Sequence, residues 1–337
     1  MEKFTAEEAE KVYLASGFAN PQLAEDIASS LGAELGPVAG RTHPNGELYV
    51  RFEDNVRGRH VFIIQPHIGS GSHTVNDAIM EQNLLASAAR SASASEITAV
   101  APYLGYTRQD RKTRGRESIA VATIIDNLAN AGVDRILAVD MHAPQSQGIF
   151  RGPFDHLTAQ HLLRKAVKEE LNGFNLDDCV VVAPDAGATK MANRHSKELG
   201  VKVLHFMKTR DPKDSQKIHR DEKVPEVDGR VCLLFDDMID TAGTLVTAAE
   251  VLMNSGAKGV IAAATHGILS DPAVERLRDA PLNRVIVTDT FVTDGPKEAL
   301  GNKLRVVSTA PLIGQAIIEI VRCGSISQHY DNEEHYS

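Results

Sequence analysis

Short apolar stretches alternate with stretches of helical periodicity along most of the chain. The apolar stretches are rich in β-branched residues, which predicts strands. The predicted strands cover residues 12–18, 60–66, 96–104, 135–142, 179–185, 201–207, 231–237, 259–267 and 284–290. Near-continuous apolar strands separated by helices are typical of parallel sheets with helices on both faces. The pattern therefore predicts an α/β fold.

Helix signals lie between these strands. Asn20 and Pro21 are expected to open a helix that ends at Gly32, with an apolar face that runs from Leu23 to Leu31. Further helices are predicted over residues 119–130 and around 163–171. Parallel sheets bind ligands beyond the carboxyl ends of their strands, so the residues that follow each strand are the candidates for chemistry.

The domain organisation follows from length and from one interruption of the pattern. With 337 residues, the chain exceeds the ~150 residues of a typical single domain. Glycine and proline interrupt the pattern near residues 150–157. We therefore predict an N-terminal domain over 1–155 and a C-terminal domain over 156–304. The remaining strand and helix, 305–337, are expected to pack back on the N-terminal domain and to end in a polar tail.

Composition excludes several classes of protein. The net charge of −9 at pH 7 argues against a nucleic-acid-binding or membrane-binding surface. The odd number of isolated cysteines, Cys179, Cys232 and Cys323, fits a reducing cytoplasm and provides no zinc site. The acidic first residues lack the apolar region of a signal peptide, and no apolar run approaches the ~18 residues that cross a membrane.

The stretch CLLFDDMIDTAGTL, residues 232–245, joins a strand to a loop of small and hydroxyl residues. Small residues let backbone N–H groups approach a phosphate, and a following helix N-terminus favours an anion. The carboxylates of Asp236 and Asp237 suit a ribose diol and can help to hold Mg²⁺. The stretch thus indicates a sugar phosphate site. The alternative is a strand that ends in solvated acids, with Asp240 or Thr241 as a helix N-cap.

Three other stretches are candidate sites. Asp140 and His142 share one face at the end of a strand, and Asp185 ends another, so that the three side chains could hold Mg²⁺ directly or through water. Residues 108–112 place cations and planar donors after a strand, which suits a nucleotide. Lys208 and Arg210 begin a long polar segment, typical either of an active-site lid or of a solvated linker. No P-loop sequence is present.

The run from Asp236 to Thr244 resembles the phosphoribosyl-diphosphate binding motif of the type I phosphoribosyltransferase fold. Five further segments resemble ribose-phosphate diphosphokinase, also called phosphoribosyl-diphosphate synthetase: residues 102–112, 139–150, 183–190, 264–277 and 310–317. The resemblance extends in family order from about Leu14 to Ile326. It implies two parallel-sheet domains of the type I phosphoribosyltransferase fold.

The resemblance also implies an activity and site residues. The family transfers the diphosphoryl group of Mg-ATP to D-ribose 5-phosphate, which gives AMP and the 1-diphosphate used in nucleotide, histidine and tryptophan biosynthesis. The ATP contacts it implies are His43, Asn45, Gly46, Glu47, Arg108 and Gln109, with His43 in place of the family's usual aromatic residue. The ribose 5-phosphate contacts are Arg210, Asp236, Asp237, Asp240, Thr241, Ala242, Gly243 and Thr244.

The remaining implications concern metal, catalysis and assembly. His142 and Asp185 are expected to contact Mg²⁺, Lys208 and Arg210 to be catalytic, and the subunits to form a hexamer. Two alternatives stay open. A phosphoribosyltransferase would share the phosphate loop but would not use the ATP segment or the Lys208–Arg210 pair. A non-catalytic regulatory paralogue would keep the fold without the activity.

Overall fold

The computed structural model describes residues 2–185, 187–205, 224–291 and 294–326. Contacts divide the chain into two compact units, each with its own large sheet. Unit 1 comprises Met1–Ala159 together with Ser308–Ser337, and unit 2 comprises Gln160–Val307. The first change of unit thus falls a few residues after the stretch in which glycine and proline interrupt the sequence pattern.

Unit 1 contains five parallel strands in the order β1-β4-β5-β6-β7. Their bounds are β1 (Val12–Ser16), β4 (His60–Ile64), β5 (Glu96–Ala101), β6 (Arg135–Val139) and β7 (Phe154–Leu157). The first four coincide with predicted strands, and their parallel pairing confirms the α/β class. Strand β7 was not predicted, because its sequence FDHL contains no continuous apolar run.

An antiparallel hairpin, β2 (Val38–Thr42) and β3 (Leu48–Phe52), forms a separate sheet in unit 1. The hairpin was not predicted from the sequence. All positions of both strands are exposed or half-buried, so the hairpin lacks the apolar run of a core strand. The turn between the strands includes Gly46, whose φ of 91° is a conformation that side chains rarely adopt.

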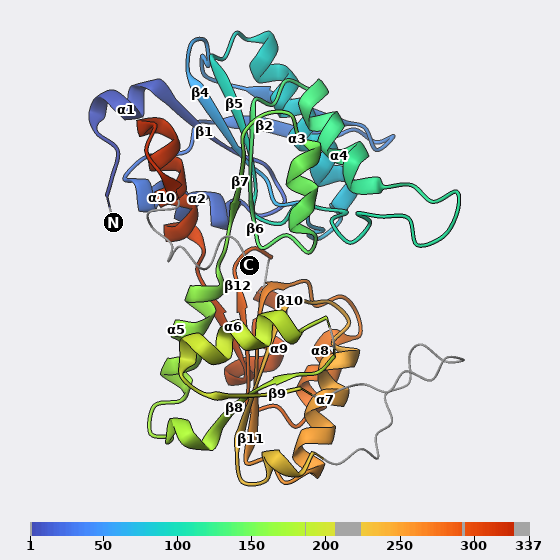
Figure 1. Ribbon diagram of the computed structural model, residues 1–337. Helices are drawn as coiled ribbons and strands as arrows, with labels where there is room; N and C mark the ends of the chain where they lie inside the picture. The colour runs from blue at the N-terminus through green and yellow to red at the C-terminus, as the bar shows by residue number, and fades with distance from the viewer. Residues whose placement is uncertain (1, 186, 206–223, 292–293, 327–337) are drawn as a thin grey trace. The chain divides into compact units, whose positions relative to one another are not determined.

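Helices cover both faces of the sheet of unit 1 (Figure 1). They are α1 (Ala6–Lys11), α2 (Pro21–Leu31), α3 (Val75–Ser91), α4 (Ala120–Asn130), the short 3₁₀ helix η1 (Pro144–Ile149) and α10 (Ala310–Arg322). Helix α2 begins and ends as predicted: the Asn20 side chain accepts a hydrogen bond from the Leu23 amide, and Gly32 adopts a φ of 66°. The predicted apolar face of α2, Leu23, Ile27 and Leu31, is fully buried.

The C-terminal helix α10 packs against α2 in unit 1. A Cβ atom on Gly314 would lie 2.3 Å from Ser30 Oγ, so the missing side chain allows this close approach. Arg322, at the end of α10, bonds to the carboxylates of Glu2 and Glu8 near the N-terminus. The helix of the C-terminal segment therefore belongs to unit 1.

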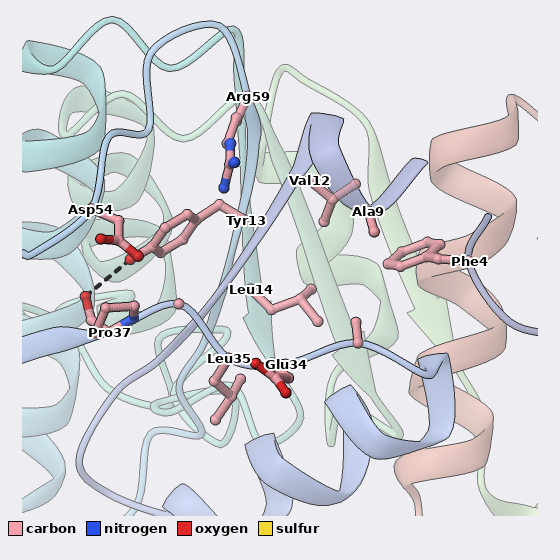
Figure 2. A pocket seen from close by; sticks show the side chains of 12 residues that line it. Phe4, Ala9, Val12, Tyr13, Leu14, Glu34, Leu35, Pro37, Asp54 and Arg59 are labelled. Carbon is pink, nitrogen blue, oxygen red and sulfur yellow. Dashed lines mark hydrogen bonds between the residues drawn. The ribbon is translucent and has the colours of Figure 1, made fainter. Parts of the chain in front are cut away.

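A pocket of about 260 Å³ lies beside β1 in unit 1 (Figure 2). Apolar side chains of Val12, Leu14 and Leu35 contribute to its lining. The Tyr13 hydroxyl donates a hydrogen bond of 2.9 Å to the Pro37 carbonyl. The pKa of Tyr13 is raised to about 12, mainly by burial and next by the negative charge of the nearby Asp54 carboxylate. The hydroxyl therefore stays protonated. None of the predicted site residues lines the pocket, so it is distinct from the candidate site.

Unit 2 contains six parallel strands in the order β13-β12-β11-β10-β8-β9. Their bounds are β8 (Cys179–Ala183), β9 (Lys202–His205), β10 (Val231–Ile239), β11 (Gly259–Gly267), β12 (Arg284–Thr288) and β13 (Leu304–Val307). The helices of unit 2 are α5 (Gln160–Glu170), α6 (Thr189–Leu199), α7 (Gly243–Asn254), α8 (Ala273–Asp279) and α9 (Asp294–Leu300), with short 3₁₀ turns η2 (Leu176–Asp178), η3 (Pro225–Val227) and η4 (Gly301–Lys303).

Alternate residues of the strands of unit 2 contribute their side chains to two separate hydrophobic cores. Leu233 and Phe235 of β10 pack in one core with residues of α5 and α6. Cys232 and Leu234 pack in the other core with residues of α7 and α8. Because successive side chains of a strand point to opposite faces, this division confirms the predicted helices on both faces of the sheet. Within the described residues, no helix is both long and apolar enough to cross a membrane.

The position of β13 corrects one detail of the sequence prediction. The segment from residue 305 was expected to pack on the N-terminal domain as a strand and a helix. Strand β13 instead pairs with β12 in the sheet of unit 2, and only α10 belongs to unit 1. The change of unit falls between Val307 and Ser308, since the strand finds its hydrogen-bonding partner at the edge of the second sheet.

Candidate functional site

Strand β10 carries two carboxylates at the carboxyl end of the sheet of unit 2. The strand continues through Asp236 and Asp237 to Ile239, two residues beyond the predicted end. Its neighbour β11 extends equally far, and Met238 and Ile239 pair with His266 and Gly267. The acids therefore stand on a hydrogen-bonded strand, and a strand holds side chains more firmly than a loop does.

The loop that follows β10 leads directly into α7. Helix α7 begins at Gly243, preceded by Ala242 with a φ of 59°. The side chains of Thr241 and Thr244 are exposed to solvent. Among the described residues, no side chain caps this helix, so the alternative that Asp240 or Thr241 is its N-cap is wrong. The first N–H groups of α7 thus keep the arrangement that binds a phosphate.

Three carboxylates lie near one another at the carboxyl ends of the neighbouring strands β8 and β10. Asp185, which follows β8, accepts a hydrogen bond of 3.0 Å from the Ala188 amide. Burial, followed by the charges of Asp237 and Asp185, raises the pKa of Asp236 to about 8. The Asp236 side chain keeps contact with solvent, so the neighbouring charges are the cause that best fits its position. Such a site favours a ligand that brings hydroxyl donors or a cation.

The two predicted metal contacts belong to different units. Asp185 lies in unit 2, and His142 lies in unit 1 beyond the end of β6, with an exposed side chain. Next to it, Asp140 has a φ of 37° and accepts a hydrogen bond of 2.9 Å from the Ala159 amide. In the part of the chain that the structure describes, no three acidic, histidine or cysteine side chains form a metal cage.

The predicted ATP contacts His43, Asn45, Gly46 and Glu47 form the turn of the β2–β3 hairpin. The His43 amide donates to the Glu47 carbonyl at 2.7 Å, and the Gly46 amide donates to the His43 carbonyl at 2.8 Å. The Asn45 side chain accepts from the Glu47 amide at 3.2 Å. The imidazole of His43 lies edge-on to Tyr49, with 6.4 Å between ring centres. These bonds hold the turn rigid and leave its side chains accessible.

Arg108 and Gln109, the other predicted ATP contacts, lie in the loop between β5 and α4. Both side chains are exposed. The Gln109 amide donates to the Tyr106 carbonyl at 2.9 Å, which closes a turn within this loop. Lys208 and Arg210, the predicted catalytic residues, lie outside the described residues.

Arg276 contacts the loop between β10 and α7, and this contact was not predicted from the sequence. From α8, its guanidinium donates a hydrogen bond of 3.0 Å to the Thr241 carbonyl. The residue lies within the segment 264–277 that carries part of the family resemblance, but no spacing rule connects it to Thr241. Only the packing of α8 beside α7 brings the two together.

Two family models match the chain. Residues 12–132 match the N-terminal domain of ribose phosphate pyrophosphokinase, and residues 220–331 match the phosphoribosyl synthetase-associated domain. Over 325 residues the chain is 44% identical to ribose-phosphate pyrophosphokinase of Bifidobacterium longum, with 96% of this chain and 94% of the relative covered. It is 43% identical over 322 residues to the enzyme of the same name from Corynebacterium glutamicum, with 95% and 96% covered.

The chain belongs to the ribose-phosphate pyrophosphokinase family. A solved structure agrees: phosphoribosylpyrophosphate synthetase from Mycobacterium smegmatis superimposes with a TM-score of 0.84 at 39% identity, over 93% of this chain and 100% of that one. The resemblance stated from the sequence motifs is thereby confirmed, as is the fold of two parallel sheets covered by helices. The likeness spans both units of this pyrophosphokinase family member.

Proposed function

We propose that the chain is a ribose-phosphate diphosphokinase, which converts ATP and D-ribose 5-phosphate into AMP and 5-phospho-α-D-ribose 1-diphosphate. The observation that carries the proposal is the pairing of strand-borne carboxylates with a loop of small and hydroxyl residues that leads into the N-terminus of α7, directly after β10. This pair suits the two ends of one ligand, the diol and the phosphate of ribose 5-phosphate. The product serves nucleotide, histidine and tryptophan biosynthesis.

The sugar phosphate binds along the loop from Asp236 to Thr244. Asp236 and Asp237 accept hydrogen bonds from the ribose hydroxyls. These hydrogen bonds stabilise the charged carboxylates against their mutual repulsion. Asp240 assists them at the start of the loop. Thr241, Ala242, Gly243 and Thr244 hold the 5-phosphate through hydroxyl and N–H groups and through the dipole of α7. Arg210 is proposed to add a positive charge beside this phosphate.

ATP is proposed to bind to residues of unit 1. The hairpin turn of His43, Asn45, Gly46 and Glu47 contacts the nucleotide, with the His43 imidazole against the adenine. Arg108 and Gln109 supply donors for the base and the phosphates. Because the backbone that carries these groups is already held in place before ATP arrives, little conformational entropy is lost on binding.

The transfer needs positioning and charge neutralisation, and no covalent enzyme intermediate. The ribose 1-hydroxyl oxygen forms a bond to the β-phosphorus while the bond from that phosphorus to the oxygen of the α-phosphate breaks, and AMP leaves. Lys208 and Arg210 stabilise the negative charge on the transferring group. Mg²⁺, when bound, neutralises the triphosphate, and His142 and Asp185 would hold it, in part through water.

Two further proposals concern the setting of the enzyme. The three cysteines are free thiols, which supports the proposed cytoplasmic location. We also propose a hexameric assembly, by analogy with the family. Neither proposal involves a nucleic acid or a membrane as partner.

The purified chain is expected to form AMP when it is incubated with Mg-ATP and ribose 5-phosphate. Separation of the nucleotides by ion-exchange chromatography measures this directly. Omission of the sugar is the control and should give no AMP. Formation of ADP with ribose 1,5-bisphosphate would contradict diphosphoryl transfer, and the absence of any product would favour the non-catalytic paralogue.

Removal of divalent cations is expected to abolish AMP formation. Excess EDTA should stop the reaction, and added Mg²⁺ should restore it. With ATP fully complexed, a further increase in free Mg²⁺ should still raise the rate, because His142 and Asp185 are proposed to hold a metal ion near the triphosphate in addition to the Mg²⁺ of Mg-ATP. Full activity in EDTA would argue against a role for Mg²⁺.

A further inference from the structure

A buried imidazole holds the start of the loop that carries Arg108 and Gln109. His67 follows β4, and its side chain is fully buried. Its Nδ1 accepts a hydrogen bond of 3.1 Å from the Gly105 amide. Since an amide N–H can only donate, Nδ1 is unprotonated, and the proton of the neutral ring is on Nε2.

The other ring nitrogen is fixed by Gln82 of α3. His67 Nε2 lies 2.8 Å from Gln82 Oε1, and the tautomer set by Gly105 makes Nε2 the donor. The amide nitrogen of Gln82 donates in turn to the Ile63 carbonyl at 3.1 Å and to the Val100 carbonyl at 3.5 Å. Gln82 is fully buried and so is tied to both β4 and β5. A buried network with its groups paired resists rotation, because each broken bond would leave a polar atom unsatisfied.

The anchored amide lies close to the proposed nucleotide contacts along the chain. His67 also donates from its own backbone to the Tyr103 carbonyl at 2.9 Å, so the ring and the backbone both hold this segment. Tyr106, which directly follows Gly105, has a φ of 63°, and its hydroxyl donates to Asn76 Oδ1 at 2.6 Å. The Tyr106 carbonyl then accepts from the Gln109 amide. Every turn from the strand end to Gln109 is thus fixed by a hydrogen bond.

Gly105 allows the close approach. A Cβ atom at this position would lie 3.1 Å from the Cβ of His67, a separation at which one of the two neighbours must move. The missing side chain at residue 105 therefore lets the backbone amide approach Nδ1 without displacing His67. The contact between His67 and Gly105 depends on both residues.

We propose that His67, oriented by Gln82, is a positioning residue for ATP: it holds the Gly105 amide and thereby sets the loop that presents Arg108 and Gln109 to the nucleotide. The inference rests on the proposed function, since it takes these two side chains as nucleotide contacts. Burial lowers the pKa of His67 to about 4, against the opposing effect of the Gln82 hydrogen bond, so the ring stays neutral and Nδ1 remains an acceptor near neutral pH.

A matched pair of variants separates positioning from folding. His67→Asn places a carbonyl oxygen near the position of Nδ1, so it keeps an acceptor for Gly105 and loses the bond to Gln82. His67→Gln places an amide nitrogen near the position of Nε2, so it keeps the bond to Gln82 and loses the acceptor. Each variant gives up one buried hydrogen bond, so both should lower the thermal midpoint by similar amounts.

The two variants are expected to differ in ATP affinity alone. His67→Gln should raise both the KM and the dissociation constant for ATP about fivefold, the loss of one hydrogen bond, whereas His67→Asn should stay within about twofold of the wild type. The KM for ribose 5-phosphate should be unchanged in both. Equal ATP affinity in the two variants, or an equal rise in the KM for the sugar, would overturn the inference and leave His67 as a structural residue.

Calorimetric titration of the full chain with a non-hydrolysable ATP analogue, without sugar, makes the test independent of turnover. A wild-type chain that binds the analogue but forms no AMP would refute the proposed function and still permit the comparison of variants. If His67→Gln fails to fold, Gly105→Ala takes its place, because the added methyl group displaces the amide from Nδ1. A folded Gly105→Ala variant with unchanged analogue affinity would also overturn the inference.

Discussion

Replacement of Asp236 by asparagine is expected to weaken the binding of ribose 5-phosphate by about tenfold to a hundredfold. The substitution keeps the shape of the side chain but removes the charge of a hydrogen-bond acceptor, a loss of roughly 1.5–3 kcal/mol. The loss should shrink with 2-deoxyribose 5-phosphate, which lacks one of the two hydroxyls. Sugar phosphate affinities and KM values for the two sugars measure the difference.

The companion variant Thr244→Val tests the other end of the ligand. It removes a hydroxyl donor to the 5-phosphate, so it should weaken both sugars alike. Asp279→Asn is the matched control, since its carboxylate is exposed at the end of α8, and it should leave both affinities unchanged. An equal loss for both sugars in Asp236→Asn would show that this carboxylate does not contact the diol.

Thermal unfolding distinguishes a lost contact from a damaged fold. Because the pKa of Asp236 is raised to about 8 in the folded chain, the folded state loses stability as the pH rises from the ordinary aspartate pKa towards 8, where the unfolded chain gives up this proton more readily. Asn carries no charge, so Asp236→Asn should raise the thermal midpoint at neutral pH while it lowers sugar affinity. Loss of both stability and affinity would indicate that the carboxylate supports the fold.

Lys208→Met is expected to lower kcat by about a hundredfold to a thousandfold, with little change in the KM for either substrate. The reason is that a cation acting on the transferring phosphoryl group stabilises the transition state more than the bound substrates. The prediction rests on the sequence and on family membership, because Lys208 lies outside the described residues. Steady-state rates of AMP formation measure it.

Lys202→Met is the matched control for this variant. Lys202 is an exposed cation of β9, so its loss should leave kcat unchanged. A fall in kcat in both variants would indicate a general effect of charge. An unchanged kcat in Lys208→Met, or a rise in KM alone, would assign Lys208 to substrate binding and remove it from the catalytic step.

The apolar pattern was sufficient to predict most of the two parallel sheets. Runs such as 61–64 and 259–264 are buried on both faces, so their sequence is apolar at every position and predicts a strand without knowledge of its partners. The ends of helix α2 were also predictable from the sequence, because the cap residues Asn20 and Gly32 interact only with residues a few positions away in the chain. The phosphate-binding role of the loop from Asp240 to Thr244 stays a prediction from the sequence, where small residues and hydroxyls lie next to each other.

Elements that depend on a distant partner escaped prediction. The β2–β3 hairpin has half-exposed strands, and its signal is the pairing of one strand with the other. Strand β10 continues past its predicted end to Ile239 because β11 lies beside it, and a run that turns acidic gives no sign of continued pairing. Strand β13 joins unit 2 only because an edge of that sheet is open to it.

The sequence by itself determined the fold class, the family and the residues that suit a ribose phosphate, because each depends on neighbouring positions in the chain. Tertiary structure alone decided that Ala242 stands at the N-cap of α7, that Asp185 shares the electrostatic environment of Asp236, and that Arg276 holds the Thr241 carbonyl. It also joined His67, Gln82 and Gly105 into one network. These residues come from different elements, and only the packing of strands and helices brings their polar atoms within hydrogen-bonding distance.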